Sequence, residues 1–506
     1  MQSFQYDTPQ TERSDEAEVK NNAGGYVYAT NDRLRRFLVL GCDGSTYYTN
    51  RNANVKDNLE YLRGALKADP TGYVDEVLHV NLNALAPKVD TQLFALALAS
   101  VEGDAATRKR VLGELSSFCR TGTHLFNFLE YRKQLGGGWG KLVRDAVKGW
   151  YSRDAHQVAH QVAKYRQRDG WSHRDVLRLA HPKPLNEVHD AVFEFATSDV
   201  VTSRAPEILK IHRKVTEAKS AKEVCDLIDE HPKMVMREFI PTQFLTDAMV
   251  WRKLIKDMPL MAMVRNLRNM HKHGAMNGHT TRMIVNRLQD EEVIRRSRMH
   301  PVHFLLALSA FAEASAAIQG ALEGAFYLAF KNVEPTGKRI MIAMDVSGSM
   351  HLGAVAGTNL TPAQVSMAMA MVTVNVDDCD VFGFGTSFKS LPFVKPGSNL
   401  NSLVRKVRGM SFGGTDCALP MRHARQLKKE YDAFVIYTDN ETWAGATKPM
   451  NELRSYRRQF VKDAKLIVVG MTSSGFSIAD PRDPLTLDVV GFDASAPQVI
   501  SQTISA

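Results

Sequence analysis

The pattern of hydrophobic residues changes at Pro335-Thr336-Gly337, and this change divides the chain into two kinds of fold. Before it, amphipathic helical stretches follow one another almost without strands over about 300 residues. After it, compact β-rich runs at residues 339–344, 381–388, 433–437 and 465–471 alternate with helical stretches. Because strands that alternate with helices form a doubly wound parallel sheet, we expect a helical domain over 26–335 and an α/β domain over 336–506.

The helical part is typical of an α-solenoid built from helix pairs. Short connections marked by Gly and Pro join its helices, as at Gly136-Gly137-Gly138, although no repeat of fixed period is visible. The expected helices cover residues 55–66, 91–100, 106–118, 123–134, 141–150, 156–168, 221–228, 241–256 and 260–271. Residues 1–25 are polar and acidic, so we expect a disordered tail there.

Cysteine usage and hydropathy indicate a cytoplasmic protein. The five cysteines are far apart and form no CxxC pair for zinc or redox chemistry, which fits a reducing compartment. The first residues lack the apolar core of a signal peptide. The most apolar long run, residues 303–330, is interrupted by Glu313, Gln319 and Glu323, which favours a buried helix pair over a membrane span.

Positive charge is concentrated in two segments. The chain carries a formal net charge of +9. Residues 131–183 alone contain twelve Lys and Arg against four Asp and Glu, and residues 252–300 contain eleven against four. The rest of the chain is therefore mildly acidic, and the local excess is what a binding surface for a polyanion such as nucleic acid requires.

The segment 164–184 is the centre of the first basic region. Ser172 followed by Asp175 predicts a capping box, so a helix should begin near His173. It should end near His181, because proline at the next position disfavours helical backbone there. Arg174, Arg178 and His181 would share one face of this helix. Upstream, Lys164 and Arg168 repeat the spacing of four residues.

A solvated charged face is the alternative interpretation of this stripe. Aromatic residues interleaved with the charges favour nucleic acid, because they allow base stacking beside phosphate contacts. These residues are Trp150, Tyr151, Tyr165 and Trp171. The two tryptophans could equally be packed anchors of the fold.

A candidate metal site lies where the first strand of the α/β domain ends. The sequence there is Asp345-Val346-Ser347-Gly348-Ser349. Thr415 lies in a Gly-Gly-Thr-Asp loop at residues 413–416 before the next helix, and Asp439 follows the strand AFVIYT. Ligand sites of such sheets lie at the carboxyl edge, so these oxygens should meet. Carboxylate and hydroxyl oxygens suit a divalent cation such as Mg²⁺ or Mn²⁺. The five residues resemble the metal-ion-dependent adhesion site of von Willebrand A domains.

Two other interpretations of Asp345 compete with the metal site. It could merely cap the following turn. It could also be an aspartyl-phosphate nucleophile, but the second carboxylate of that chemistry is replaced here by Ser347, which disfavours an enzyme.

Two other groups of residues are expected to be structural. His271, His273 and His279 resemble a zinc cluster, but a second set of ligands is missing. Met367, Met369 and Met371 are expected to fill the core.

Strings across nearly the whole chain resemble the Ro autoantigen ribonucleoproteins. The strings are RLRRFLVLGCDGSTYYT at 33–49, THLF at 123–126, the segment 164–184, RNL at 265–267, HPVHFLLAL at 300–308, DVSGSM at 345–350, GGTDCALPM at 413–421 and TDNETWAG at 438–445. The resemblance implies a closed, monomeric ring of HEAT-type helical repeats whose ends are clasped by the von Willebrand A domain. It also implies a protein that is not an enzyme.

The resemblance implies RNA partners as well. Small stem-loop Y RNAs would bind the outer surface of the ring, at Lys164, Arg168 and His181, and helical spacing adds Arg174 and Arg178. The single-stranded 3′ end of misfolded RNA would enter a central hole. An exoribonuclease such as polynucleotide phosphorylase is a candidate protein partner.

The second basic segment is a further candidate RNA surface, with intramolecular ion pairing as its alternative. Its cations are Arg265, Arg268, Lys272, Arg282, Arg287, Arg295 and Arg296. We therefore expect a non-catalytic RNA-binding scaffold that serves RNA quality control. The alternatives are a metal-dependent adhesion module that captures an acidic partner, and a metal-dependent phosphohydrolase.

Overall fold

The computed structural model describes most of the chain. The described residues are 11–12, 26–29, 34, 37–38, 51–83, 89–168, 170–311, 313, 315–355, 359–410, 414–438, 445, 447–471, 476–479, 483, 485–490 and 496–505. They form a helical domain followed by an α/β domain, so the predicted fold class is confirmed.

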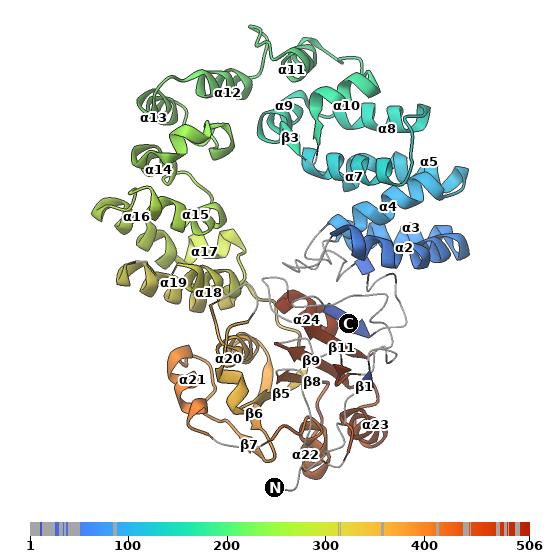
Figure 1. Cartoon of the computed structure of the whole chain (residues 1–506), viewed down its shortest axis with the longest axis vertical. Helices are drawn as coiled ribbons and strands as arrows, with labels where there is room; N and C mark the ends of the chain where they lie inside the picture. The colour runs from blue at the N-terminus through green and yellow to red at the C-terminus, as the bar shows by residue number, and fades with distance from the viewer. Residues whose placement is uncertain are drawn as a thin grey trace.

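The helical domain is an arc whose two ends lie beside the α/β domain (Figure 1). Its helices are α2 (Arg51–Ala68), α3 (Pro70–Leu82), α4 (Asp90–Glu102), α5 (Ala105–Gly113), α6 (Leu115–Phe118), α7 (Gly122–Gln134), α8 (Lys141–Tyr151), α9 (Ala155–Lys164), α10 (His173–Ala180), α11 (Glu187–Ser198), α12 (Glu207–Glu217), α13 (Ala221–Glu230), η1 (Arg237–Phe239), η2 (Thr242–Thr246), α14 (Ala248–Leu254), α15 (Leu260–Lys272), α16 (Gly278–Gln289), α17 (Glu291–Ser297), α18 (Pro301–Ala310), α19 (Ala316–Leu328) and η3 (Ala329–Asn332).

Side-chain caps define where many of these helices begin. Asp104, Asp154 and Asn186 each accept a hydrogen bond from a backbone N–H of the first turn, which would otherwise lack a partner. The apolar run 303–330 divides into α18 and α19, as expected of a buried helix pair. No helix in the described ranges is both long enough and apolar enough to cross a membrane.

The α/β domain contains a seven-stranded sheet of order β2-β11-β9-β8-β5-β6-β7. Its strands are β5 (Arg339–Asp345), β6 (Asp378–Phe384), β7 (Phe388–Ser390), β8 (Ala433–Thr438), β9 (Lys465–Gly470), β11 (Thr486–Val490) and β2 (Tyr26–Ala29). The five central strands are parallel, and β7 and β2 add antiparallel edges.

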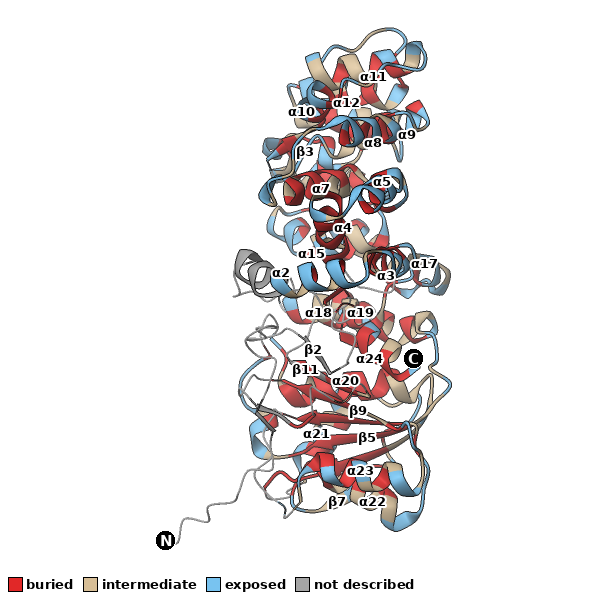
Figure 2. Cartoon of the chain, turned by 90° about the vertical axis from the view of Figure 1, so that its right-hand side faces the viewer, coloured by how far each residue is buried: buried red, intermediate tan, exposed pale blue. Residues whose placement is uncertain are grey.

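Helices cover both faces of this sheet, which is why its strands are apolar throughout. Ile340 and Ile342 of β5 pack on the face that carries α20 (Pro362–Val374), α21 (Leu400–Arg408) and α24 (Ala496–Ser505). Met341 and Ala343 pack on the other face, against α22 (Leu419–Leu427) and α23 (Pro449–Gln459). Figure 2 shows the strands coloured as buried along most of their length.

Three predictions about secondary structure were wrong in detail. The helix expected over 156–168 ends at Lys164, because the chain turns into a hairpin of β3 (Gln167–Arg168) and β4 (Trp171–Ser172). Residues 26–29, assigned above to the helical domain, pair as β2 with β11 of the sheet. Within the tail expected to be disordered, β1 (Thr11–Glu12) pairs with β10 (Phe476–Ser477).

The C-terminal end of the arc docks directly on the α/β domain. The backbone N–H of Asn359 donates to Ser309 Oγ of α18 at 2.9 Å. The Tyr327 hydroxyl of α19 accepts from the backbone N–H of Leu400 at 2.9 Å, and Glu323 accepts from the Asn399 amide at 2.9 Å. One continuous apolar core runs from the helices into this face of the sheet.

Candidate nucleic-acid interface and metal site

Helix α10 has the two ends that the sequence predicts. The Ser172 hydroxyl accepts from the Asp175 backbone N–H at 3.2 Å, and the Asp175 carboxylate accepts from the Ser172 N–H at 3.0 Å. His181 ends the helix in left-handed backbone with φ of 51°, and its N–H donates to the Leu177 carbonyl. The helix is therefore fixed at both ends by its own sequence.

The exposed side of α10 carries the predicted stripe. Val176, Leu177 and Ala180 are buried. Arg174, Arg178 and His181 are exposed. Burial of one face thus leaves the cations on the other, as the amphipathic pattern predicts.

Arg168 reaches this surface through the hairpin and not through a helix. Its Cα pairs with that of Trp171, the residue before the cap of α10. Gly170 between them has φ of +79°, which explains the break in the helix. Lys164 is the last residue of α9, partly buried, with its Nζ 5.4 Å from the ring centre of Tyr165. In Figure 2, β3 and α10 lie side by side.

Some cations near α10 form salt bridges within the protein, and others do not. Arg166 pairs with Asp199 at 2.8 Å, so it holds the fold together. Over the described ranges, neither Arg168, Arg174 nor Arg178 forms a salt bridge. Their charge is therefore available to a ligand.

The core beneath α10 is aromatic and closed to solvent. Trp150 is fully buried and its Nε1 donates to the Cys119 carbonyl at 2.6 Å. The Tyr151 hydroxyl lies 2.6 Å from His173 Nδ1. Burial lowers the pKa of His173 to about 3, so the imidazole is neutral. Trp171 is buried too, and its Nε1 donates to Glu130 at 2.9 Å. Trp150 and Trp171 are thus packed anchors and not stacking platforms.

Some cations of the second basic segment have partners within the protein, and others do not. Arg252 donates to the carbonyls of Ala275 and Gly274, and Arg287 to those of Ile255 and Met258. Arg295 and Arg296 both pair with Glu292. Intramolecular ion pairing therefore holds for Arg295 and Arg296, whereas Arg252 and Arg287 are held by backbone carbonyls.

Four other cations of this segment are exposed. Arg265, Arg268 and Lys272 lie on the exposed side of α15, opposite its buried residues, and Arg282 is exposed on α16. Figure 1 shows α15 on the inner side of the arc and α16 on its outer side. In Figure 1, α15 and α10 lie on opposite arms of the arc, so their exposed cations form separate groups.

Four of the five predicted metal ligands meet at the carboxyl edge of the sheet. Asp345 ends β5 and is 2% exposed. Its Oδ1 accepts from the Ser347 backbone N–H at 2.8 Å, and its Oδ2 lies 3.5 Å from Thr415 Oγ1. Ser347 Oγ and Ser349 Oγ are 3.0 Å apart. This set of one carboxylate and three hydroxyls has the hard-oxygen chemistry that a small divalent cation requires.

The fifth predicted ligand, Asp439, lies outside the described residues. The residue before it, Thr438, ends β8 and donates from Oγ1 to Asp345 Oδ2 at 3.1 Å. Thr438 was missed by sequence analysis, although its place at a strand end of the same edge was a usable signal.

Buried charges hold the Thr415 loop in place. Asp416 is buried, its backbone N–H donates to the Gly385 carbonyl at 3.0 Å, and its carboxylate accepts from the Ala418 N–H at 3.0 Å. Burial raises the pKa of this carboxyl group. Arg422 lies 3.4 Å from Asp416, and Gly445 packs so closely that a Cβ there would be 2.4 Å from the Asp416 carboxyl carbon.

The other sequence candidates are structural. His271 packs against the Phe311 ring, and the described part of the chain holds no group of three or more His, Cys, Asp or Glu side chains arranged for a metal. The methionines at 367, 369 and 371 are buried in α20, so their predicted core role is confirmed.

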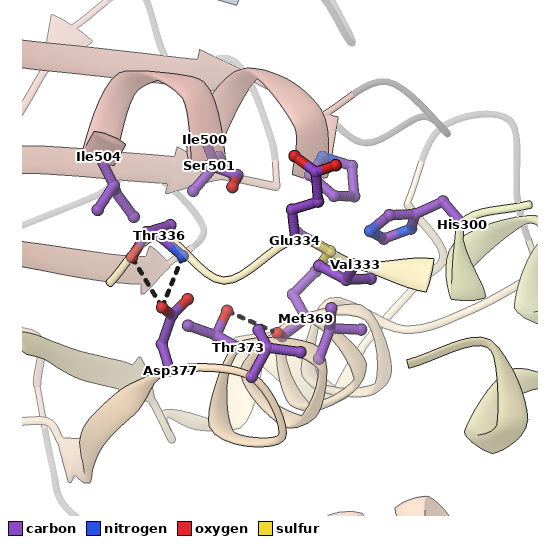
Figure 3. A pocket seen from close by; sticks show the side chains of 13 residues that line it. His300, Val333, Glu334, Thr336, Met369, Thr373, Asp377, Ile500, Ser501 and Ile504 are labelled. Carbon is purple, nitrogen blue, oxygen red and sulfur yellow. Dashed lines mark hydrogen bonds between the residues drawn. The ribbon is translucent and has the colours of Figure 1, made fainter. Parts of the chain in front are cut away.

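A small cavity lies at the seam between the two domains (Figure 3). It is lined by His300, by α20 and α24, and by the connecting segment, where Asp377 accepts from the Thr336 N–H at 2.7 Å. Its volume of about 30 Å³ suits roughly two water molecules and no nucleotide. The cavity is therefore too small to be a substrate site.

Comparison with known proteins shows the family. A model of the TROVE domain matches residues 19–238 and 230–319, and a model of the Ro60 vWA domain matches residues 339–504. The chain is 39% identical to the RNA-binding protein RO60 of Deinococcus radiodurans, covering 97% of this chain and 96% of that protein. It is 31% identical to the RNA-binding protein RO60 of Caenorhabditis elegans, covering 98% of this chain and 91% of that protein.

A solved structure agrees with these matches. The crystal structure of the Deinococcus radiodurans RO (RSR) protein superposes with a TM-score of 0.85 at 37% identity, covering 94% of this chain and 99% of that chain. The helical arc and the α/β domain therefore correspond to a TROVE domain and a von Willebrand A domain. On these matches, the chain belongs to the Ro60 family.

Proposed function

We propose that this protein is a non-catalytic scaffold that binds RNA. The observation that carries the proposal is the group of exposed arginines on α10 and the hairpin before it, Arg168, Arg174 and Arg178. Guanidinium groups held on a fixed element suit phosphate contacts, because little side-chain and backbone freedom is lost on binding. The names of the Deinococcus and Caenorhabditis relatives, both RNA-binding proteins, support the same conclusion.

The two cationic surfaces suit two classes of RNA. The surface of α10 and the β3–β4 hairpin, with Lys164 and His181 at its margins, would take the paired stem of a small Y RNA through its phosphates. The inner side of the arc, with Arg265, Arg268 and Lys272 of α15, would take the single-stranded 3′ end of a misfolded RNA through a central opening. RNA quality control requires this combination of a structured and a single-stranded ligand.

The α/β domain contributes a binding site of its own in this proposal. Asp345, Ser347, Ser349 and Thr415, completed by Asp439, would hold Mg²⁺. Such an ion supplies an open coordination position for an acidic group of a partner. An exoribonuclease such as polynucleotide phosphorylase, tethered through the bound Y RNA, is the protein partner that fits a scaffold without its own catalysis.

The second candidate function is a metal-dependent adhesion module in which RNA is secondary. The convergence of the four oxygen ligands at the sheet edge favours it. It predicts that a protein partner is lost on chelation or in Asp345→Ala, while RNA binding survives.

Two measurements test the proposed function: the affinity of the protein for two RNAs, and whether those RNAs remain intact. Wild-type protein is titrated with a stem-loop RNA and with a duplex carrying a single-stranded 3′ tail. The Lys164/Arg168/His181 triple alanine variant should lose the stem-loop and retain the tailed duplex. Both RNAs should be recovered intact after prolonged incubation with Mg²⁺.

A matched variant controls for the loss of charge. Lys67, Arg108 and Lys109 are exposed on α2 and α5, away from the α10 surface. Their triple alanine variant should bind both RNAs as wild type does. Failure of the wild-type protein to bind either RNA, or cleavage of RNA that depends on Asp345, would overturn the proposal.

A further inference from the structure

One tryptophan near the α10 surface is partly exposed. Among the tryptophans that the structure describes, Trp150, Trp171 and Trp251 are buried, whereas Trp139 keeps part of its ring in solvent. Trp139 lies in the glycine-rich loop of residues 136–140, between α7 and α8. An indole that remains exposed beside a cationic surface is a candidate contact for a ligand with aromatic rings.

A buried arginine holds this loop in one conformation. Arg132 is 5% exposed, and its guanidinium donates to the Ser100 carbonyl at 2.9 Å and to the Gly138 carbonyl at 3.2 Å. The Gly137 backbone N–H donates to the Arg132 carbonyl at 2.7 Å. A Cβ at Gly137 would lie 2.7 Å from a methyl carbon of Val101, so only glycine fits there. The loop therefore presents Trp139 without a large loss of entropy on binding.

The Trp139 ring is supported on one side by the hairpin that carries Arg168. Its centroid lies 6.0 Å from that of Trp171, with an angle of 45° between the rings. Trp171 is held by its hydrogen bond to Glu130, and it pairs across the hairpin with Arg168. Trp139 thus lies beside the hairpin that carries Arg168.

The charges around this ring favour a nucleic acid over an apolar protein segment. Lys133, whose side chain is 70% exposed, and Lys141 flank the loop. Glu130 is the nearby acid, and it already accepts hydrogen bonds from Trp171 and Gln134 and lies 3.8 Å from Lys133. The exposed face around Trp139 is therefore cationic.

We propose that Trp139 stacks on an unpaired nucleobase of the RNA whose phosphates contact Arg168. Every base offers a π face, so this contact depends on whether an unpaired base is present and not on which base it is. The inference rests on the proposed RNA-binding function and adds a specificity to it: among stem-loop RNAs, the surface would prefer those with an unpaired base beside the stem.

The test compares two RNAs that differ only in pairing. One is a stem with a single unpaired base, and the other is the same stem fully paired. Wild type, Trp139→Ala and Trp139→Phe are titrated with both RNAs over a series of salt concentrations. Leu142→Ala, at an apolar residue of α8 that is 47% exposed, is the matched control.

We expect Trp139→Ala to weaken binding of the RNA with the unpaired base by about tenfold, the usual size of one base–aromatic contact. Trp139→Phe should restore most of that affinity. The dependence of log K on log salt should not change, because no phosphate contact is removed. The fully paired RNA should bind all variants alike.

Three results would overturn the inference: equal affinity of Trp139→Ala and wild type for the RNA with the unpaired base, the same loss for both RNAs, or a flatter salt dependence. The outcomes also distinguish failure of the stacking contact from failure of the proposed RNA-binding function. If wild type binds both RNAs and Trp139→Ala changes nothing, only the stacking contact is wrong. If wild type binds neither RNA, the RNA-binding function itself is wrong.

Discussion

The buried histidines of the helical domain make its stability depend on pH. His173 and His212 are buried and His300 is partly buried, and loss of solvent lowers their pKa values to about 3, 4 and 4 from an ordinary value of 6.5. His212 lies between the rings of Phe195 and Phe239, at centroid distances of 5.5 and 4.8 Å. Burial there, together with Arg166 and Arg213, disfavours a positive charge more than Asp199 favours it. The folded state therefore requires neutral imidazoles, whereas the unfolded chain protonates them below its own pKa.

The sign and size of the effect follow from proton linkage. The stabilising contribution is complete above pH 6.5 and is lost as the pH falls towards 4, because the unfolded state then binds more protons than the folded state. For each proton that the unfolded state binds in excess of the folded state, the free energy of unfolding falls by about 1.4 kcal/mol per unit decrease in pH. Three such groups should lower the free energy of unfolding by about 3 to 4 kcal/mol between pH 6 and pH 5. That loss is a large share of the stability of an ordinary domain.

Urea unfolding at pH 7, 6 and 5, followed by tryptophan fluorescence, measures this dependence. His212→Gln should reduce the loss between pH 6 and pH 5 by about 1.2 kcal/mol, whatever its effect on stability at pH 7. His156 is exposed on α9, so His156→Gln should keep the wild-type dependence. A wild-type stability that is flat between pH 6 and pH 5, or an unchanged slope in His212→Gln, would refute the reasoning.

Three further substitutions test the two candidate sites. Ser172→Ala removes the cap of α10 and should cost about 1 kcal/mol in urea unfolding, while Ser172→Thr should restore it. Asp345→Ala should abolish the rise in melting temperature that saturating Mg²⁺ gives the wild type. At a Mg²⁺ concentration about one hundred times the Kd, binding should stabilise the wild type by about 2.7 kcal/mol. A rise that persists in the variant would place the ion elsewhere. Gly445→Ala forces a methyl group against the Asp416 carboxyl and should weaken Mg²⁺ binding without changing RNA affinity, as measured by calorimetry and RNA titration.

Local signals were enough to predict α10, and local signals with the resemblance were enough to predict which oxygens lie together at the sheet edge. The cap at Ser172 and the proline at 182 act within one helical turn, so the sequence alone sets both helix ends. Asp345 ends a strand of the parallel sheet, and ligand sites of such sheets lie at that edge. Thr415 lies in a loop between two helices, so its place beside Asp345 was indicated by the resemblance to von Willebrand A domains.

Features that depend on distant partners could not be predicted. The spacing of Lys164 and Arg168 fits a helix, but the hairpin separates them because Gly170 adopts positive φ. Strand β2 has its hydrogen-bond partner, β11, near the opposite end of the chain. A sequence also cannot distinguish a buried indole from an exposed one, so Trp150 was considered as a stacking platform and Trp139 was missed.

The same limit applies to the cations of the second basic segment. Arg268 and Arg287 look alike in the sequence, yet Arg287 is used to hold backbone carbonyls between helices. Only the packing of α14, α15 and α16 decides which guanidinium remains exposed.

The most direct test of the account is the salt dependence of stem-loop RNA binding by the Arg168/Arg174/Arg178 triple alanine variant. Each phosphate contact that is removed should flatten the plot of log K against log salt by about one unit, so the variant should lose about three. The Lys67/Arg108/Lys109 variant, which loses the same charge, should keep the wild-type slope. Equal slopes for wild type and both variants would contradict the account, because the α10 surface would then make no phosphate contact.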